Sequence, residues 1–412
     1  MSLPDNQRIR ELDVYLQTLV TGFVIVTRIK SSLFQKKKSK KTVSAKNRYN
    51  FSIHGVANFS LSGQGPLFEY MTYQYTDFLE TNAGNFPHQN VFAVKVASAP
   101  MEPDYTQVIT MGNEKFARAT DGNGFIWSVK NKVAMLDGQK PLAEQMTLSF
   151  DPSFNKMKAN VLCELFWRFR FAQKKVALVH AACVANDNEA ILLPAWKNVG
   201  KTATCLKLVA AGSDFLADDR LWLRSDGIAL SFPRYVVLKD SNIEHFPEIS
   251  SIITKAKLHA LNLLARMKWL ESMSLFKRIR QRLIPAQYFH IKELYSASRV
   301  LSQSKISTVV QLVKSKSNVE VKMHLVDSQR SANTISNIGD VEWNHSLMTL
   351  VSAHDTFFPG GPCWSQELTE LMDDERQIVK GALSSLQCHE LSLPEEGQHL
   401  NWTAVTQKLL GQ

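Results

Sequence analysis

Cysteine is scarce in this chain. The 412 residues include only five cysteines, an odd number, and no two of them form a C-x-x-C pair. They are Cys163, Cys183, Cys205, Cys363 and Cys388. This spacing spells out neither a disulfide framework nor a zinc-binding site. We therefore expect a cytoplasmic protein whose thiols stay reduced.

The sequence also lacks an apolar run long enough to cross a membrane. Its most apolar uncharged stretch, Val14–Thr27, is shorter than the roughly 20 residues that a transmembrane helix needs. A signal peptide is not expected either. Glu11 and Asp13 precede the stretch, and basic residues follow it in place of a small-residue cleavage site.

Acidic residues are absent between Val14 and Phe68, where nine basic residues nearly equal the net charge of +10. The nine are Arg28, Lys30, Lys36, Lys37, Lys38, Lys40, Lys41, Lys46 and Arg48. A Lys/Ser-rich stretch buries too little apolar surface to offset its ordering entropy. We interpret residues 1–48 as an apolar helix followed by a solvated linker. The alternative is peripheral attachment to an anionic membrane at its inner face.

Composition and length set the broad class. With 44% hydrophobic and 21% charged residues, the chain is neither disordered nor collagen-like, and its length suits two or three domains. Residues 49–150 mix short alternating runs with one expected helix near Pro66–Thr81, which predicts a small α+β domain. They contain no recognisable chemical constellation.

A second basic segment lies further along the chain. Residues 250–292 are predicted as a helical insertion, in which nine basic side chains from Lys255 to Lys292 face only one acid, Glu271. Such a segment could contact a membrane, nucleic acid or an acidic partner, or it could pack on the core by its leucine face. Both interpretations stay open, and among the partners nucleic acid is the one least expected.

The change of period after residue 150 predicts the core of a domain spanning residues 151–412. Apolar residues at helical spacing favour a buried helix over 154–173. Compact apolar runs then predict a strand over Val176–Val184 and a second over Ala190–Leu193, joined by a tight turn.

The second predicted strand leads directly into a G-K-T sequence and a helix. That order suits a phosphate-binding loop, because the free N–H groups of a helix N-terminus hold phosphate oxygens. In this motif Lys201 would reach the β- and γ-phosphates, and the Thr202 hydroxyl would ligate Mg²⁺. The nucleotide-binding segment comprises Ala195, Trp196, Lys197, Asn198, Val199, Gly200, Lys201, Thr202 and Ala203. Ala195 replaces the first glycine of the motif, which is tolerable if its φ is negative.

Two adjacent carboxylates, Asp218 and Asp219, end the next apolar strand. An unpaired buried charge is costly, so we expect them to face a cation. Two carboxylates beside a triphosphate suit two tasks, holding Mg²⁺ and accepting the proton of an attacking hydroxyl.

These segments together resemble the C-terminal domain of HPr serine kinase/phosphorylase and its kinase-like relatives, which are distantly similar to phosphoenolpyruvate carboxykinases. The resemblance spans roughly residues 155–395. It is carried by Val179–Val184 (VHAACV), Ala190–Pro194 (AILLP), Asn198–Thr202 (NVGKT), Leu216–Asp219 (LADD) and, more loosely, Ser231–Lys239 (SFPRYVVLK). The Gly-rich signature loop of true HPr kinases has no match here.

The resemblance implies an α/β fold, a mixed-sheet P-loop kinase domain preceded by the small α+β domain. It implies that His180 lies beside the active site, that Asp218 is the catalytic base and that Asp219 is on the metal side. It also implies that Arg234 and Lys239 steady the transferred phosphoryl group. An Asp226-Gly227 hairpin signal supports a mixed sheet over a purely parallel one.

The sequence therefore predicts an ATP-dependent kinase that uses Mg²⁺ and transfers the γ-phosphoryl group to a hydroxyl acceptor. A serine of a protein or peptide is the first expectation, and a small hydroxylated metabolite is the second. The alternatives are a catalytically degenerate nucleotide-binding module and a membrane-associated scaffold.

Overall fold

The computed structural model describes residues 47–81, 92–187, 189–232, 236–238, 246, 287–315, 321–394 and 402–410. The chain separates into Met1–Lys46 and a compact unit, Asn47–Gln412. The predicted N-terminal helix lies outside the described residues, as do most of the predicted linker and of the basic insertion.

In the described part of the compact unit, eight strands form the first sheet, in the order β1-β2-β3-β8-β7-β6-β5-β4. The β2–β3 and β3–β8 pairs are parallel and the other pairs are antiparallel. The strands are β1 (Asn47–Ile53), β2 (Ala57–Gly63), β3 (Phe92–Val96), β4 (Tyr105–Met111), β5 (Glu114–Ala119), β6 (Gly124–Val129), β7 (Lys132–Asp137) and β8 (Thr147–Phe150). The predicted helix near Pro66–Thr81 is α2 (Pro66–Gln74) followed by the 3₁₀ turn η1 (Thr76–Phe78).

Helix α3 (Lys156–Ala172) is the predicted buried helix. It begins where the Asn155 side chain accepts a hydrogen bond from the Lys158 N–H at 3.0 Å, as an N-cap residue does. Its Trp167 packs against Phe59 of β2, with ring centroids 5.1 Å apart. On the other side, Phe171 stacks on Trp222 of the second sheet. Helix α3 therefore contributes to a core that both sheets share.

The second sheet has nine strands among the described residues and runs β12-β10-β11-β17-β14-β13-β9, with β19 beside β17 and β18 beside β19. They are β9 (Val176–Val179), β10 (Ala181–Asn186), β11 (Glu189–Pro194), β12 (Asp214–Ala217), β13 (Leu221–Arg224), β14 (Ile228–Leu230), β17 (Gln303–Ser315), β18 (Lys322–Val326) and β19 (Gln387–Pro394). The β11–β17 and β17–β19 pairs are parallel, whereas β10–β11 and β13–β14 are antiparallel. The sheet is mixed, and the Asp226-Gly227 hairpin is confirmed.

The strand predicted over Val176–Val184 is wrong in one respect, because the chain forms two strands there. Strand β9 pairs with β13, while β10 pairs with β11 and β12. His180 stands at the break between them. A continuous apolar run gave no turn signal at this point, so periodicity alone could not show the change of partner.

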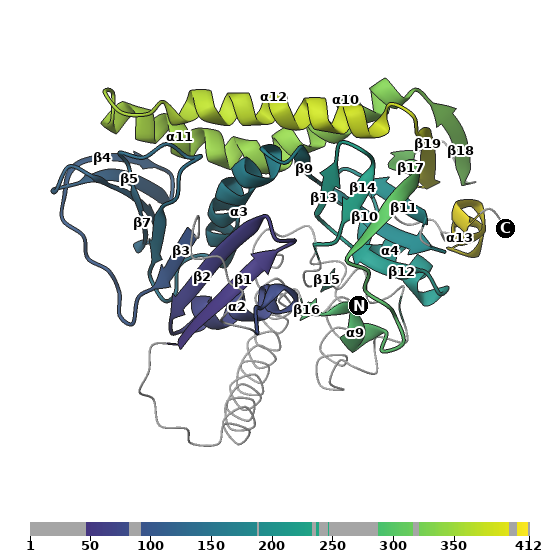
Figure 1. The fold of residues 1–412 in the computed structure, drawn as a ribbon, viewed down its shortest axis with the longest axis horizontal. Coiled ribbons are helices and arrows are strands. Elements are labelled where there is room, and N and C mark those ends of the chain that lie inside the picture. The colour runs from purple at the N-terminus through teal and green to yellow at the C-terminus, as the bar shows by residue number, and fades with distance from the viewer. Residues whose placement is uncertain are drawn as a thin grey trace, which may run out of the picture. The chain divides into compact units, whose positions relative to one another are not determined.

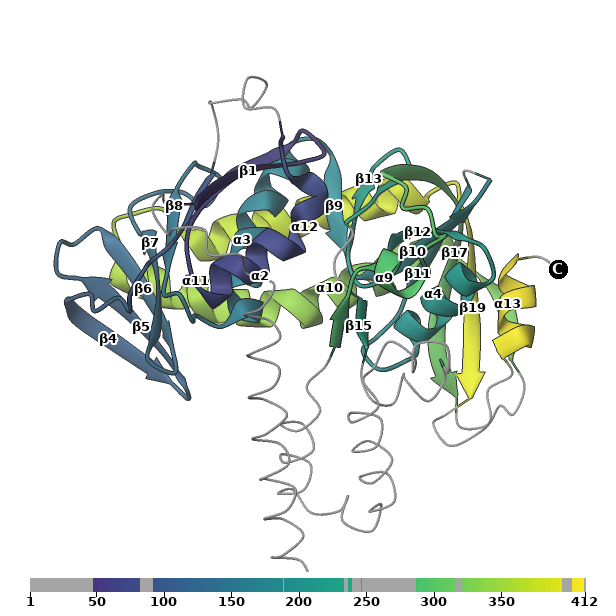
Figure 2. The same ribbon diagram turned by 90° about the horizontal axis from the view of Figure 1, so that it is seen from below.

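Helices cover the sheets. Figure 1 shows α11 (His345–Phe357) and α12 (Trp364–Leu383) side by side along one edge of the view, followed toward the second sheet by α10 (Ser328–Gly339). Between α10 and α11 lies a short π-helical segment, η4 (Asp340–Asn344). Figure 2 shows α4 (Lys201–Ala210) and α13 (Trp402–Leu410) on the second sheet's side. The remaining elements are β15 (Val236–Leu238), β16 (Gln287–Phe289) and α9 (Ile291–Leu294).

The described helices include none that combines the length and apolarity needed to cross a membrane. The architecture is thus a mixed α/β fold with two large mixed sheets.

Candidate functional site

The loop between β11 and α4 delivers the G-K-T residues to the end of the second sheet. Trp196, Lys197 and Asn198 are exposed, and Asn198 adopts a positive φ of 65°. Gly200 precedes the helix with a φ of 122°, a region that favours glycine. Among the described residues, no side chain caps this helix end. Its first N–H groups are therefore left to other acceptors.

Ala195, which replaces the first motif glycine, is fully buried and forms a parallel bridge with Leu312 of β17. Ala195 is not among the non-glycine residues of the described chain that have a positive φ. A methyl group therefore causes no backbone strain at this position. Ala203, in the first turn of α4, is also buried and packs in the core beneath the loop.

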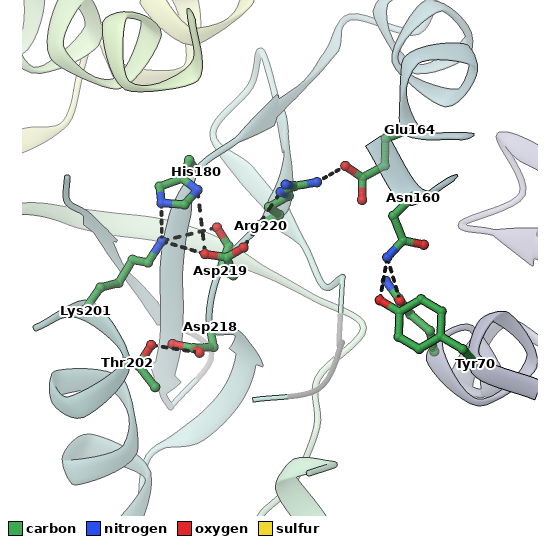
Figure 3. Close-up of polar contacts among 10 residues, drawn as sticks. Tyr70, Asn160, Glu164, His180, Lys201, Thr202, Asp218, Asp219 and Arg220 are labelled. Carbon is green, nitrogen blue, oxygen red and sulfur yellow. Dashed lines mark hydrogen bonds and ion pairs between the residues drawn. The ribbon is translucent and has the colours of Figure 1, made fainter. Parts of the chain in front are cut away.

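Lys201 points from α4 toward the ends of β9 and β12, as Figure 3 shows. Its ammonium group donates to His180 Nε2 at 2.7 Å and to Asp219 Oδ1 at 3.1 Å. The side chain is only 8% exposed. A buried ammonium group with one neutral and one charged partner can exchange those partners for phosphate oxygens at little desolvation cost.

His180 is held neutral in this arrangement. Burial and the neighbouring charge of Lys201 lower its pKa to about 4, although Asp219 opposes the change. Because Nε2 accepts from Lys201, the ring proton belongs on Nδ1, which lies 3.7 Å from Asp219 Oδ1. That separation is too long for a hydrogen bond, so His180 holds the Lys201 ammonium group through Nε2 while its Nδ1 only faces the Asp219 carboxylate.

Asp218 pairs with the other motif residue. The Thr202 hydroxyl donates to Asp218 Oδ2 at 3.1 Å, while Asp218 Oδ1 is buried with no hydrogen-bond partner among the described residues. The residue is 7% exposed. Burial, with a smaller contribution from the Asp219 charge, raises the pKa of Asp218 to about 7. An orphaned carboxylate oxygen beside a hydroxyl suits a cation or a proton donor.

Asp219 differs from its neighbour because 47% of its side chain is exposed. Its burial alone would raise the carboxyl pKa, but the charge of Lys201 and the hydrogen bond from its ammonium group outweigh burial and lower the pKa below the ordinary value. The two adjacent aspartates therefore have opposite shifts, one toward the protonated form and one toward the ionised form.

The structure brings together His180, Lys201, Thr202, Asp218 and Asp219 from three different segments. Two further predicted site residues, Arg234 and Lys239, lie outside the described residues. Of the loop residues, Lys197 contributes its positive charge near His180. Val199 and Gly200 are half-buried at the base of the loop.

Arg220 and Glu164, which were not predicted from the sequence, form a buried ion pair beside Asp219 (Figure 3). A signal for such a pair was present in the chain. Glu164 and Arg168 are charged residues one helical turn apart in a helix predicted to be buried. Charged side chains on a buried helix need partners.

Protein ligands for a metal are few here. No cluster of three or more His, Cys, Asp or Glu side chains suited to a metal exists in the described chain. Mg²⁺ typically keeps several waters and is bound through one or two carboxylates plus substrate phosphates. Thr202, Asp218 and Asp219 supply that kind of partial set.

The fold and the site define a mixed α/β protein with a cation–carboxylate cluster at a helix N-terminus. No protein-family model and no curated protein matches the sequence. Among solved structures, the HPr(Ser) kinase/phosphatase from Coxiella burnetii aligns at 14% identity, over 36% of this chain and 70% of that chain, with a TM-score of 0.21. A TM-score this low does not establish a shared fold. The function of this chain is therefore inferred from the geometry of its own site.

Proposed function

We propose that this protein is a phosphotransferase that binds ATP with Mg²⁺ and transfers the γ-phosphoryl group to a hydroxyl. A serine of a protein or peptide is the first acceptor to consider, and a small hydroxylated metabolite is the second. The observation that carries the proposal is the convergence of Lys201, Thr202, Asp218 and Asp219 at the uncapped N-terminus of α4.

The first turn of α4 supports the binding of phosphate. Its free N–H groups and the positive end of the helix dipole attract anions, and Lys201 adds a full charge within reach. Lys201 is already buried and paired, so it is pre-organised for a second anion. When bound, ATP would supply the phosphoryl group and Mg²⁺ would neutralise charge on its phosphates.

The residues present fit Mg²⁺. Asp218 Oδ1 has no partner among the described residues, and the Thr202 hydroxyl lies beside the same carboxylate. Hard oxygen ligands of this type are the ones that Mg²⁺ prefers. Asp219, ionised and half-exposed next to Lys201, offers a further carboxylate at the open side of the site.

The two aspartates differ in a way that suits acid–base chemistry. A pKa of about 7 makes Asp218 a suitable acceptor for the proton of an attacking hydroxyl near neutral pH. The lowered pKa of Asp219 suits the metal side, where a permanent charge is useful. Asp218 nevertheless accepts a hydrogen bond from Thr202, which is itself an expected Mg²⁺ ligand. Substitutions at both aspartates are therefore needed to tell the catalytic base from the metal ligand.

Substitutions at Lys201 and the aspartates test the proposal. Lys201→Ala should weaken both MgATP binding and turnover, whereas Lys207→Ala, on the same helix, should change neither. Asparagine keeps the side-chain shape and an oxygen that can face Mg²⁺, but it cannot accept a proton. Asp218→Asn should therefore leave MgATP affinity nearly intact and slow transfer by roughly 10²- to 10⁴-fold. Asp219→Asn should raise the Mg²⁺ concentration needed for half-maximal turnover. Affinity is measured by calorimetry, and transfer or hydrolysis with γ-labelled ATP and a panel of hydroxyl acceptors.

Two results would contradict the proposal in different ways. Wild-type protein that does not bind MgATP would refute phosphate binding at this loop. Protein that binds MgATP but neither transfers nor hydrolyses it, and that is unaffected by Asp218→Asn, would be a nucleotide-binding module without catalysis.

A further inference from the structure

Arg220 follows Asp219 directly, and its side chain lies between the Asp219 carboxylate and Glu164 (Figure 3). Its guanidinium is buried and forms an ion pair through Nη1 with Glu164 of α3. Arg220 Nε makes no hydrogen bond among the described residues, yet it lies 3.8 Å from Asp219 Oδ2. One end of the guanidinium is therefore fixed, while a buried donor at the other end faces the candidate site.

Trp343 of the π-helical segment η4 completes the surroundings of Arg220. The Arg220 guanidinium carbon lies over the indole, 5.4 Å from the ring centroid, and the indole is 4% exposed. Cation–π contacts are stronger when the pair is removed from water, as this pair is. Short π-helical segments are frequent at functional sites. Arg220 is thus held from two sides by residues distant in sequence.

A second arginine contacts the same indole without reaching the site. Arg168 of α3 lies 5.3 Å from the Trp343 centroid and pairs with Glu375 of α12, with Nη2 and Oε2 2.5 Å apart. Both arginine–glutamate pairs link α3 to another part of the chain. Only Arg220 lies beside Asp219, which makes Arg168 and Glu375 a natural control.

Lys201 is the other cation beside Asp219, and a nucleotide would compete for it. Phosphate oxygens that draw Lys201 away would leave the Asp219 carboxylate without its 3.1 Å partner. Arg220 does not face this competition, because Glu164 and Trp343 hold it in the interior. A rigid guanidinium loses little conformational freedom as it forms a contact, unlike a flexible ammonium chain.

We propose that Glu164, Arg220 and Trp343 form a clamp that keeps the Asp219 carboxylate in position when Lys201 turns to the phosphates of a nucleotide. The effect of the clamp on ATP turnover rests on the proposed function. Arg220 is a positioning residue, since it acts on the reaction through Asp219. Arg220 already lies beside Asp219 without nucleotide, so the clamp can be tested on the protein alone.

Matched double variants test the catalytic consequence. Glu164→Gln with Arg220→Gln replaces one buried ion pair by neutral amides, and Arg168→Gln with Glu375→Gln does the same for its twin. Each double variant removes both charges of its pair, so neither charge of that pair is left buried alone, and we expect both proteins to fold. We expect the first double variant to lower kcat for ATP turnover by roughly 10²-fold, with the KM for MgATP changed by less than about threefold. The second removes a contact to the same indole but none to Asp219, so it should lower kcat by less than about threefold and leave KM unchanged.

Three results would decide against the positioning role. They are equal kcat values for the two double variants, a loss confined to KM, and a kcat that falls only in proportion to unfolded protein in a urea titration. Arg220→Lys adds a check. It keeps the charge but not the planar fork, and we expect it to restore only part of the lost kcat.

An NMR measurement on nucleotide-free protein tests the clamp itself. The Arg220 Nε–H resonance is assigned by its absence from the Glu164→Gln, Arg220→Gln variant. Asp219→Asn should shift this resonance and leave the Arg168 Nε–H resonance in place. An unchanged Arg220 resonance would overturn the clamp. Wild-type protein without ATP turnover would instead overturn the proposed function, and the clamp would still be decided by this spectrum.

Discussion

Gly200 tests the geometry of the loop. A side chain at this position would strain the backbone, because of its positive φ, but would not clash with neighbouring atoms. Its φ is 122°, and an added Cβ would meet only Leu393 Cδ1, at 3.5 Å. That distance is an ordinary van der Waals contact. Gly200→Ala should therefore cost about 1–2 kcal/mol of unfolding free energy through backbone strain alone.

Gly212, just beyond the other end of α4, provides the control. Its φ is 107°, and an added Cβ would have no neighbour within 4 Å. Gly212→Ala should lose a similar free energy of unfolding, measured by urea titration. Only Gly200→Ala should also turn the first N–H groups of α4 away from the phosphates. Losing one hydrogen bond to a charged group would weaken MgATP binding by about 10- to 100-fold.

Calorimetry with MgATP separates the two effects. Equal MgATP affinity in the two variants would refute the idea that the loop holds phosphate through its backbone. A Gly200→Ala protein as stable as wild type would contradict the positive φ.

Three further predictions concern single residues. The folded protein retains the Asp218 proton up to about pH 7, whereas the unfolded chain releases it near 3.8. The free energy of unfolding of wild type should therefore fall relative to that of Asp218→Asn as pH rises from about 4 to 7, by up to about 1.4 kcal/mol per pH unit. Urea titrations with a chelator present measure this difference, and a difference that stays constant with pH would contradict the prediction. Cys363 is exposed and the other four cysteines are buried, so a thiol reagent should label one equivalent of native protein and none of Cys363→Ser. Phe171 stacks on Trp222 with ring centroids 3.8 Å apart, both fully buried, and Phe171→Ala should lower the free energy of unfolding by about 3–5 kcal/mol in urea, far more than Phe171→Leu.

The parts of the site that sequence could predict are those that are contiguous in the chain. The run from β11 through the loop to α4 shows a change from compact apolar residues to Gly-Lys-Thr and then to helical spacing. Asp218 comes shortly afterwards at the end of β12. Turn chemistry likewise located the β13–β14 hairpin at Asp226-Gly227.

The parts that sequence could not predict depend on contacts between distant residues. Arg220 and Glu164 are 56 positions apart, and Arg168 bonds Asn344 across 176 positions. No local pattern joins them, although two charges on a buried helix indicated that partners must exist. The insertion of β17 between β11 and β14 is also a long-range choice. The break at His180 went unseen for a different reason, since both sides of it are equally apolar.

The central claim is that the N-terminus of α4 holds the phosphates of a nucleotide. A crystal structure of the full chain with Mg²⁺ and a non-hydrolysable ATP analogue tests it most directly. We predict β- and γ-phosphate oxygens within hydrogen-bond distance of Lys201 Nζ and of the backbone N–H groups at Gly200 and Lys201, with Lys201 released from His180. A nucleotide bound elsewhere, or Lys201 still joined to His180 and Asp219 in the complex, would contradict the account.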